Sequence, residues 1–174
     1  MKSEVILVDL QDYPIGTCEK LMAHLEGKLH RAISVFIFNS KGEMLMQQRA
    51  FEKYHSGGLW TNTCCSHPCP GEEALDAAQR RLFEEMGIQC KLKKVFEFVY
   101  QTDLDNGLIE YEYDHVFIGF FDKDPILNRE EACNFRWEDP KMILEKMKKK
   151  PDCFTFWFKK ILTERFEFWL SPSI

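Results

Sequence analysis

The sequence predicts an α+β protein or an α/β sandwich, in which helices flank a mixed β-sheet. The length of 174 residues suits one domain, and a hydrophobic share of 45% is enough for a substantial core. Strand-like runs and helical periodicities follow one another in mixed order along the chain. Because no repeat, low-complexity stretch or Pro/Gly/Ser linker interrupts them, we expect residues 1–174 to form a single domain.

The first predicted elements are a strand, a helix and a β-hairpin. Val5–Leu10 is rich in β-forming residues, and Thr17–Leu25 has a helical pattern with Thr17 as its N-cap. A hairpin follows, because Asn and Gly favour a tight connection between two β-rich runs. The two strands are Arg31–Phe38 and Glu43–Gln48, and the turn between them is Asn39–Gly42. The loop after the hairpin is Ala50–Pro70.

The second half is predicted to contain a helix, a pair of strands and two closing helices. The helix Glu72–Met86 ends before Gly87, which readily takes the left-handed conformation found past helix ends. The turn signal Asp105-Asn106-Gly107 separates two further β-rich runs. The two strands are Val95–Gln101 and Ile109–Phe121. The two closing helices are Pro140–Lys149 and Phe154–Trp169.

Charge and hydropathy argue against several function classes. The chain has 28 acidic and 23 basic residues, and its formal charge of -5 repels nucleic-acid phosphates and anionic lipids. The longest apolar run, Ala32–Phe38, is far shorter than the roughly 20 residues that span a bilayer. The amino terminus has no secretory-signal pattern, and the seven cysteines suit free thiols better than disulfides. We therefore expect a cytoplasmic monomer that binds neither nucleic acid nor membrane.

One glutamate of the predicted helix Glu72–Met86 falls on its apolar face. At about 100° per residue, Glu85 lies within the apolar arc, so its carboxylate is expected to be buried and to need a cation or hydrogen-bond donors. The alternative is an i,i+4 pair between Arg81 and Glu85 on a partly solvated flank. The apolar arc is formed by Ala74, Leu75, Ala78, Leu82 and Met86.

The predicted strand Ile109–Phe121 carries three acidic residues on one face. Alternation places Glu110, Glu112 and Asp114 side by side, where they either face water, face a divalent cation or share protons. Imidazole and carboxylate together form a ligand set for transition-metal-type ions. Two of these carboxylates could therefore form one metal site with the histidines that lie outside predicted strand interiors, which are His24, His30 and His67.

Cysteines gather in the loop before the predicted helix. Cys64, Cys65 and Cys69 lie close in sequence to His67. A structural zinc knuckle is one interpretation, but the paired C-x2-C spacing is missing and adjacent residues rarely reach one tetrahedral ion. A thiol activated for proton transfer or nucleophilic attack is the more specific hypothesis, although cysteines are ordinarily buried apolar residues.

Taken together, these segments resemble the Nudix superfamily. The stretch Ser66-x5-Glu72-x7-Arg80-Arg81-Leu82-x-Glu84-Glu85-x-Gly87-Ile88 keeps the spacing of the Nudix box, G-x5-E-x7-R-E-U-x-E-E-x-G-U, in which U is aliphatic. Ser66 replaces the leading Gly, and Arg81 replaces the first Glu of the R-E pair. That Glu would be expected to bind a hydrolytic metal ion, so its loss argues against ordinary Nudix hydrolysis.

Two further motifs narrow the resemblance. Thr61-Asn62-Thr63-Cys64-Cys65-Ser66-His67-Pro68 and Glu110-Tyr111-Glu112 occur in order with the altered box. From about Val5 to Leu162, the chain resembles the type I isopentenyl-diphosphate Δ-isomerase branch of the superfamily. The resemblance implies a Nudix-like α/β/α sandwich.

The resemblance also implies a role for each matching residue. Cys65 and Glu112 match the catalytic cysteine and glutamate, and Tyr100 and Trp157 match two other active-site residues. Glu85 matches the ligand of a Mg²⁺ that accompanies the diphosphate. A further divalent ion, Mg²⁺, Mn²⁺ or Zn²⁺, would be held by His24, His30, His67, Glu110 and Glu112. The bases that match the diphosphate contacts, which would otherwise be interpreted as solvated surface residues, are Lys20, Arg49, Lys53 and Arg81.

The resemblance implies an isomerase that converts isopentenyl diphosphate to dimethylallyl diphosphate. This reaction adds a proton at one carbon and removes one two carbons away, so it needs an acid and a base on opposite sides of the substrate. Cys65 would lie on one side and Glu112 with Tyr100 on the other, and Trp157 would stabilise the carbocation between them. The alternatives are a Nudix diphosphohydrolase and a metal-stabilised binding module without catalysis.

Overall fold

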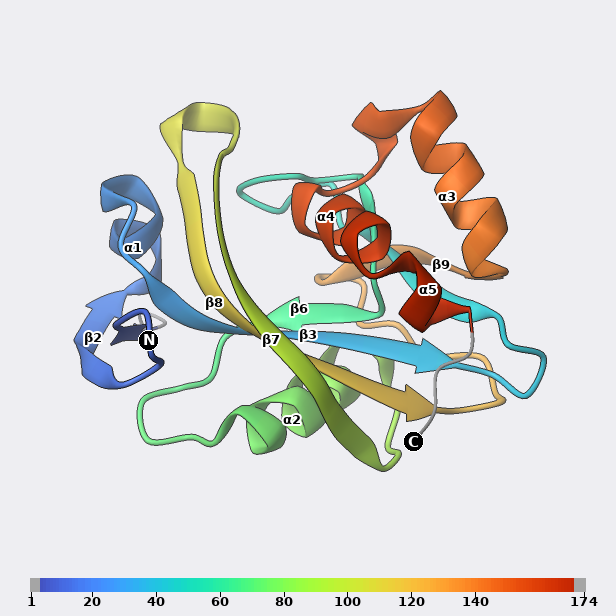
Figure 1. Cartoon of the computed structure of the whole chain (residues 1–174), viewed down its shortest axis with the longest axis horizontal. Coiled ribbons are helices and arrows are strands. Elements are labelled where there is room, and N and C mark those ends of the chain that lie inside the picture. Colours follow the sequence, from blue (N-terminus) through green and yellow to red (C-terminus); the bar gives the residue numbers. More distant parts are fainter. Residues whose placement is uncertain (1–3, 171–174) are drawn as a thin grey trace.

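The computed structural model describes residues 4–170, which form a mixed β-sheet with helices on both faces (Figure 1). Its strands are β1 (Glu4–Val8), β2 (Pro14–Glu19), β3 (His30–Phe38), β4 (Met44–Arg49), β5 (Trp60–Thr61), β6 (Cys64–Ser66), β7 (Leu92–Asp103), β8 (Ile109–Phe120) and β9 (Ala132–Glu138). Its helices are α1 (Lys20–Glu26), α2 (Ala74–Met86), α3 (Pro140–Lys149), α4 (Phe156–Glu164) and α5 (Phe166–Trp169), with 3-10 turns at Asp105–Gly107 and Pro151–Cys153.

Strand β3 lies at the centre of the sheet and pairs with four other strands, β1, β4, β6 and β8. It runs parallel to β8, with His30 opposite Glu112 and Phe38 opposite Phe120. It also pairs antiparallel with β6, where Ser34 lies opposite Cys65. Histidine, carboxylate and thiol groups from distant parts of the sequence are therefore brought to neighbouring strands.

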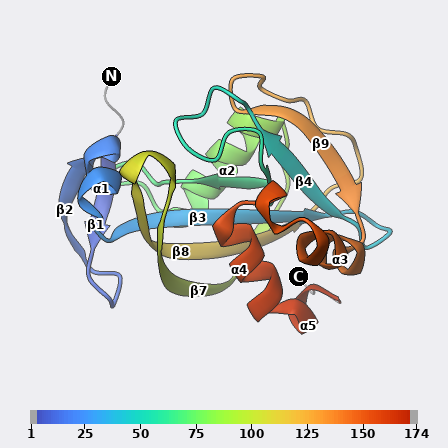
Figure 2. The ribbon, with the colours of Figure 1, turned by 90° about the horizontal axis from the view of Figure 1, so that it is seen from above.

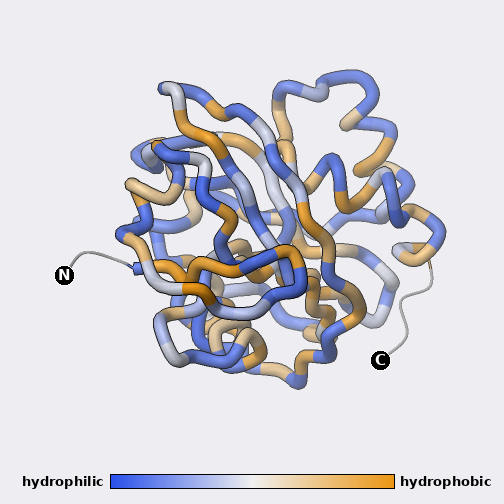
Figure 3. Tube along the Cα trace, turned by 60° about the vertical axis from the view of Figure 1, so that its left-hand side comes forward, coloured by the Kyte–Doolittle hydropathy of each residue, from blue (hydrophilic) through white to orange (hydrophobic). Residues whose placement is uncertain are grey.

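The side chains of β3 alternate between two hydrophobic layers. Phe36 and Phe38 pack with α3, α4 and α5, whereas Val35 and Ile37 face α2 on the other side. Figure 2 shows α3, α4 and α5 together on one face, and Figure 3 shows hydrophobic and hydrophilic residues alternating along the chain. The predicted sandwich, with a mixed sheet between helices, is therefore confirmed.

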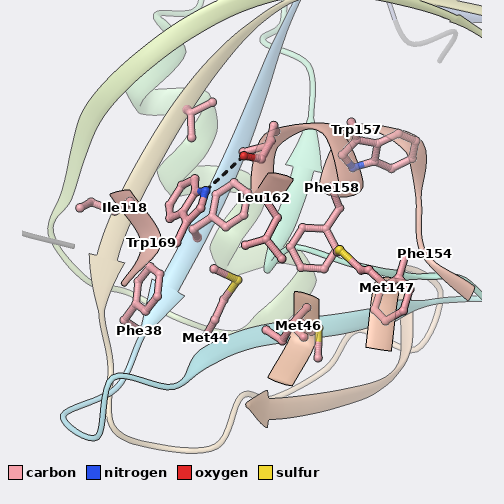
Figure 4. Packing of buried hydrophobic residues seen from close by; sticks show 14 of the residues in the cluster. Phe38, Met44, Met46, Ile118, Met147, Phe154, Trp157, Phe158, Leu162 and Trp169 are labelled. Carbon is pink, nitrogen blue, oxygen red and sulfur yellow. Dashed lines mark hydrogen bonds between the residues drawn. The ribbon is translucent and has the colours of Figure 1, made fainter. Parts of the chain in front are cut away.

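The aromatic carboxyl-terminal segment completes one of these layers. Trp169 is 1% exposed, stacks on Phe36 with ring centroids 4.4 Å apart, and donates a hydrogen bond from Nε1 to the carbonyl of Ile161 at 3.2 Å (Figure 4). The chain must bend at Arg165 to bring this ring to the sheet. The single helix predicted over 154–169 is therefore wrong, and α4 and α5 replace it.

Several other predicted elements differ from the structure. Thr17 is not a helix cap, because it lies in β2 opposite Ile6, and α1 begins only at Lys20. Leu75 is 41% exposed, so it is not part of the buried face of α2. The loop predicted over 50–70 contains β5 and β6, and the sequence analysis missed β9. Gly87 ends α2 with φ of 65°, as predicted. No helix within residues 4–170 is long and apolar enough to cross a membrane.

Candidate active site

A polar cavity lies where α1, α2, α4, β6, β8 and the loop of residues 50–59 meet. Cys65 and Glu112, the predicted acid–base pair, both line it. The other predicted site residues on its wall are Lys20, Arg49, Lys53, His67, Arg81, Glu85, Glu110 and Trp157. His24, His30 and Tyr100 are buried and contact wall residues from behind. The structure thus brings all the predicted site residues together.

The three predicted histidines point one ring nitrogen each toward the others. Nδ1 of His24 and Nδ1 of His30 lie 2.7 and 2.8 Å from the carbonyl oxygens of Lys20 and Lys28. These bonds leave Nε2 of both rings free as an acceptor, and Nε2 of His30 lies 3.2 Å from Nε2 of His67. Burial lowers the pKa of all three rings, that of His30 to about 3, so neutral imidazoles face one point.

The three acidic side chains of β8 are all buried. Glu110, Glu112 and Asp114 are 3, 6 and 1% exposed, which excludes the alternative that this face opens to water. Burial raises the pKa of Glu110 and Asp114 well above the ordinary range, and the Glu112 carboxylate raises both further. Asp114 also accepts a hydrogen bond from Ser34 Oγ at 2.7 Å.

Glu112 uses its two carboxylate oxygens for different partners. Oε1 lies 2.8 Å from His67 Nε2 and 3.7 Å from His30 Nε2. Oε2 accepts a 2.6 Å hydrogen bond from the hydroxyl of Tyr100, which is 4% exposed. One oxygen therefore belongs to the histidine cluster and the other to a proton donor.

The thiol of Cys65 lies on the cavity wall and is held by a hydrogen bond. Its Sγ–H donates to Asn62 Oδ1 at 2.9 Å, and Ser34 Oγ lies 3.6 Å from Sγ. The Asn62 amide is fixed, because Nδ2 donates to the carbonyls of Val35 and Cys64. Burial raises the pKa of Cys65, and the Asp114 carboxylate adds to this shift, so the thiol keeps its proton.

The neighbouring cysteines have different surroundings. Cys64 is fully buried in the core beneath α2, and Cys69 is exposed. Every group in residues 4–170 that could hold a metal consists of histidine and glutamate only. The zinc-knuckle interpretation is therefore wrong, and the seven thiols are free, as expected.

The four predicted diphosphate bases line one part of the cavity. Burial, followed by the charges of Lys53 and Arg49, lowers the pKa of Lys20 to about 8. Arg49 lies with its guanidinium carbon 5.4 Å from the ring centre of Trp157. Lys53 pairs with Glu131. The four bases thus line the cavity together with four glutamates, and Lys53 and Arg81 are paired with two of them.

Glu85 is buried as predicted, and its ion pair with Arg81 also forms. Arg81 Nη2 lies 2.8 Å from Glu85 Oε1 and 2.9 Å from Glu131 Oε1. Gln47 Nε2 donates to the other oxygen of Glu85 at 2.9 Å. Each interpretation of Glu85 is therefore correct in part. The carboxylate is buried, and the i,i+4 pair with Arg81 forms, but the pair lies at the cavity wall rather than on a solvated flank.

The donor set fits a divalent cation at the histidine cluster. His24, His30, His67 and Glu112 offer ligand atoms that lie within 4.8 Å of one another, a spacing that one ion can bridge. His24 Nε2 and Glu110 Oε2 are buried without a hydrogen-bond partner, and a bound cation would satisfy both. The side chains present therefore suit a metal site.

Six residues of the cavity wall were not predicted as site residues, and two of these, His55 and Glu131, carry groups that can bind a cation. His55 lies in the 50–59 loop, is 6% exposed and falls within 4.8 Å of ligand atoms on His24 and Glu110. Burial, followed by the Arg49 charge, lowers its pKa to about 2. Both residues lie outside the motifs that carry the resemblance. The signal in the sequence that could have indicated them is the presence of histidine and acidic side chains in their loops.

Comparison with known proteins identifies the fold as that of the NUDIX domain. The family model described as NUDIX domain matches residues 28–158. A crystal structure of a Deinococcus radiodurans protein has a TM-score of 0.79 at 16% identity and covers 93% of this chain and 98% of its own. A MutT protein from Methanosarcina mazei has a TM-score of 0.65 at 21% identity, with 80% and 93% covered. These similarities concern the fold.

Curated relatives define the branch. The chain is 52% identical over 162 residues to isopentenyl-diphosphate Delta-isomerase 2 of Aromatoleum aromaticum, covering 93% of this chain and 86% of the relative. It is 51% identical over 167 residues to isopentenyl-diphosphate Delta-isomerase of Pectobacterium atrosepticum, with 96% and 93% covered. The chain therefore belongs to the isopentenyl-diphosphate Delta-isomerase family.

Proposed function

We propose that this chain interconverts isopentenyl diphosphate and dimethylallyl diphosphate by a 1,3-allylic proton shift in isoprenoid precursor biosynthesis. The observation that carries the proposal is the shared cavity of Cys65 and Glu112, a thiol and a carboxylate from different strands. The names of the curated relatives support the same activity. An acid and a base on one cavity wall are what a double-bond shift without redox chemistry requires.

The surroundings of Cys65 and Glu112 indicate how each side chain would take part in the proton transfer. Cys65 holds a protonated thiol, because burial raises its pKa, so it is suited to exchange a proton with a carbon atom rather than to attack as a thiolate. Glu112 exchanges its proton through Oε2, the oxygen bonded to Tyr100, while Oε1 stays with the histidines. Tyr100 orients the carboxylate and stabilises its charge.

The intermediate of such a shift is a tertiary carbocation, which Trp157 is placed to stabilise. Trp157 lines the cavity, and the Arg49 guanidinium carbon lies 5.4 Å from its ring centre, so the ring is placed to contact a positively charged group. A cation–π contact of this kind contributes about 2 kcal/mol when desolvated. The negative charge of Glu112 acts in the same direction.

The remaining residues bind the diphosphate and the ions. Lys20, Arg49, Lys53 and Arg81 offset its charge, and Glu85 would hold a Mg²⁺ that neutralises the phosphate oxygens. His24, His30, His67, Glu110 and Glu112 would hold the further divalent ion, which would orient the Glu112 carboxylate and offset its charge.

Arg81 disfavours the diphosphohydrolase alternative. A hydrolytic Nudix box has a glutamate at this position, whereas here a guanidinium binds Glu85 and Glu131. The curated relatives agree with the isomerase and not with a hydrolase. The metal-stabilised binding module is disfavoured by the same relatives.

The test is incubation of the protein with isopentenyl diphosphate and Mg²⁺ in D₂O. We expect dimethylallyl diphosphate with deuterium incorporated at carbon. Release of phosphate without isomerisation would instead establish hydrolysis, and binding without either product would establish a binding module.

A further inference from the structure

We propose that His55 is a further ligand of the ion at the histidine site and that it is supplied by the 50–59 loop. His55 lies in a group with His24 and Glu110 whose ligand atoms are all within 4.8 Å of one another. His24 also belongs to the group formed with His30, His67 and Glu112. The two groups share only His24, so an ion bound to His24 would draw the remaining side chains of both groups toward it. The inference rests on the proposed function only in placing the ion in this cavity.

Unsatisfied acceptors beside His55 support the assignment. Nδ1 of His24 is engaged with the Lys20 carbonyl at 2.7 Å, so Nε2 carries a lone pair, and that atom is buried without a partner. Glu110 Oε2 is likewise buried without a partner. The His55 ring stacks beside the His24 ring at an interplanar angle of 30°, with centroids 5.8 Å apart. A cation between these groups would satisfy lone pairs that no described donor reaches.

The number of donors agrees with one octahedral ion. The expected set of three histidines and two glutamates gives five side-chain ligands, and His55 makes six. Six-coordinate geometry suits Mg²⁺ and Mn²⁺, and nitrogen-rich sites favour the transition metal of the two. Tyr54, the neighbour of His55, packs edge-on against its ring with centroids 4.5 Å apart.

The consequence of this ligand is a link between the ion and the loop that binds the diphosphate. The 50–59 loop also carries Lys53, whose ammonium pairs with Glu131 at the cavity wall. The His55 carbonyl accepts a hydrogen bond from Arg49 Nη2 at 3.2 Å. An ion bound to His55 would therefore tie down a segment that carries one predicted diphosphate base, Lys53, and accepts a hydrogen bond from another, Arg49.

The first test needs no mutation. Metal-free full-length protein is loaded with Mn²⁺ alone, and pulsed EPR counts the imidazole nitrogens bound to the ion. We expect one ion per chain with four directly bound imidazoles. Three imidazoles would overturn the proposal, and so would two ions per chain, because His24, His55 and Glu110 would then hold an ion of their own.

The second test compares two neighbouring substitutions in the same loop. His55→Ala should weaken Mn²⁺ binding by about tenfold or more, whereas Tyr54→Phe should leave the Kd at the wild-type value. Hydrogen exchange of residues 50–59 should slow when Mn²⁺ is added to the wild type and to Tyr54→Phe, but not to His55→Ala. An unchanged Kd in a folded His55→Ala protein would overturn the assignment. Because no substrate is present, this outcome is distinct from a failure of the isomerase proposal.

Discussion

The hydroxyl of Tyr100 donates a 2.6 Å hydrogen bond to Oε2 of Glu112, the oxygen that the histidine cluster leaves free. A carboxylate usually offers both oxygens to similar partners, but here one oxygen faces imidazoles and the other a phenol. The division follows from the register of β7 and β8, in which Tyr100 lies opposite Glu112. Proton exchange and metal binding can therefore occur on one residue without competing for the same atom.

Tyr100→Phe removes the hydroxyl and keeps the ring, so it tests the role of this hydrogen bond. We expect kcat to fall by about 10²-fold, because Glu112 loses the donor that orients and stabilises its free oxygen. The KM for isopentenyl diphosphate and the bound metal should change little, since the hydroxyl donates to the Glu112 oxygen that does not face the histidines. A wild-type kcat would show that Tyr100 has no part in the proton transfer.

Cys65→Ala is expected to reduce turnover by about 10³-fold or more while leaving the fold and the metal content intact. The adjacent Cys64→Ala is the matched control, because Cys64 is fully buried in the core beneath α2 and its loss should cost about 1–2 kcal/mol of stability without loss of turnover. Turnover and metal content are measured on both proteins. Activity retained in the Cys65 variant would remove this thiol from the chemistry.

His67→Asn should lower bound metal and turnover together. The shorter side chain cannot keep the contacts of Nε2 with Glu112 at 2.8 Å and with His30 at 3.2 Å. We expect metal affinity to fall by about tenfold or more. His115→Asn is the control, because His115 is also a buried histidine but pairs with Asp12 at 3.0 Å, away from the cavity. Normal metal content in His67→Asn, measured by elemental analysis, would refute the ligand assignment.

Periodicity predicted the parts of the site that depend on a single element. The 100° spacing in α2 placed Glu85 on a buried face, and the two-residue alternation of β8 placed Glu110, Glu112 and Asp114 together. The same reasoning could have found β9, where Cys133, Phe135 and Trp137 alternate with Asn134 and Arg136. These features are local, because each is set by the geometry of one helix or strand.

Tertiary contacts decided the parts that the sequence did not predict. Strands β5 and β6 have two and three residues, too few for any periodicity, and exist because they pair with β4 and β3. Thr17 suits a helix cap, but pairing with Ile6 in β1 outweighs that local preference. His55 and Glu131 enter the site through loops, whose paths follow from packing rather than from a repeating pattern.

Glu131→Gln tests the carboxylate that forms ion pairs with two of the predicted diphosphate-binding bases, Lys53 and Arg81. Burial opposes its ionisation, but hydrogen bonds from Lys53 and Arg81 outweigh this and lower its pKa from 4.5 to about 2. The lowered pKa sets an upper limit of about 3 kcal/mol on the stability gained by ionisation. We expect about 1–2 kcal/mol after solvent screening, because the side chain is 19% exposed.

The sign of this contribution gives its pH dependence. A carboxyl group with a lowered pKa stabilises the folded state above pH 4.5 and loses that effect as the pH falls toward 2. Denaturant unfolding should therefore show Glu131→Gln to be less stable than the wild type at pH 6, with the difference shrinking progressively below pH 4.5. Glu145→Gln should show no such dependence, because Glu145 and its partner Lys148 are both more than half exposed. An equal stability difference at pH 6 and pH 3 would mean that Glu131 acts through packing and not through its charge.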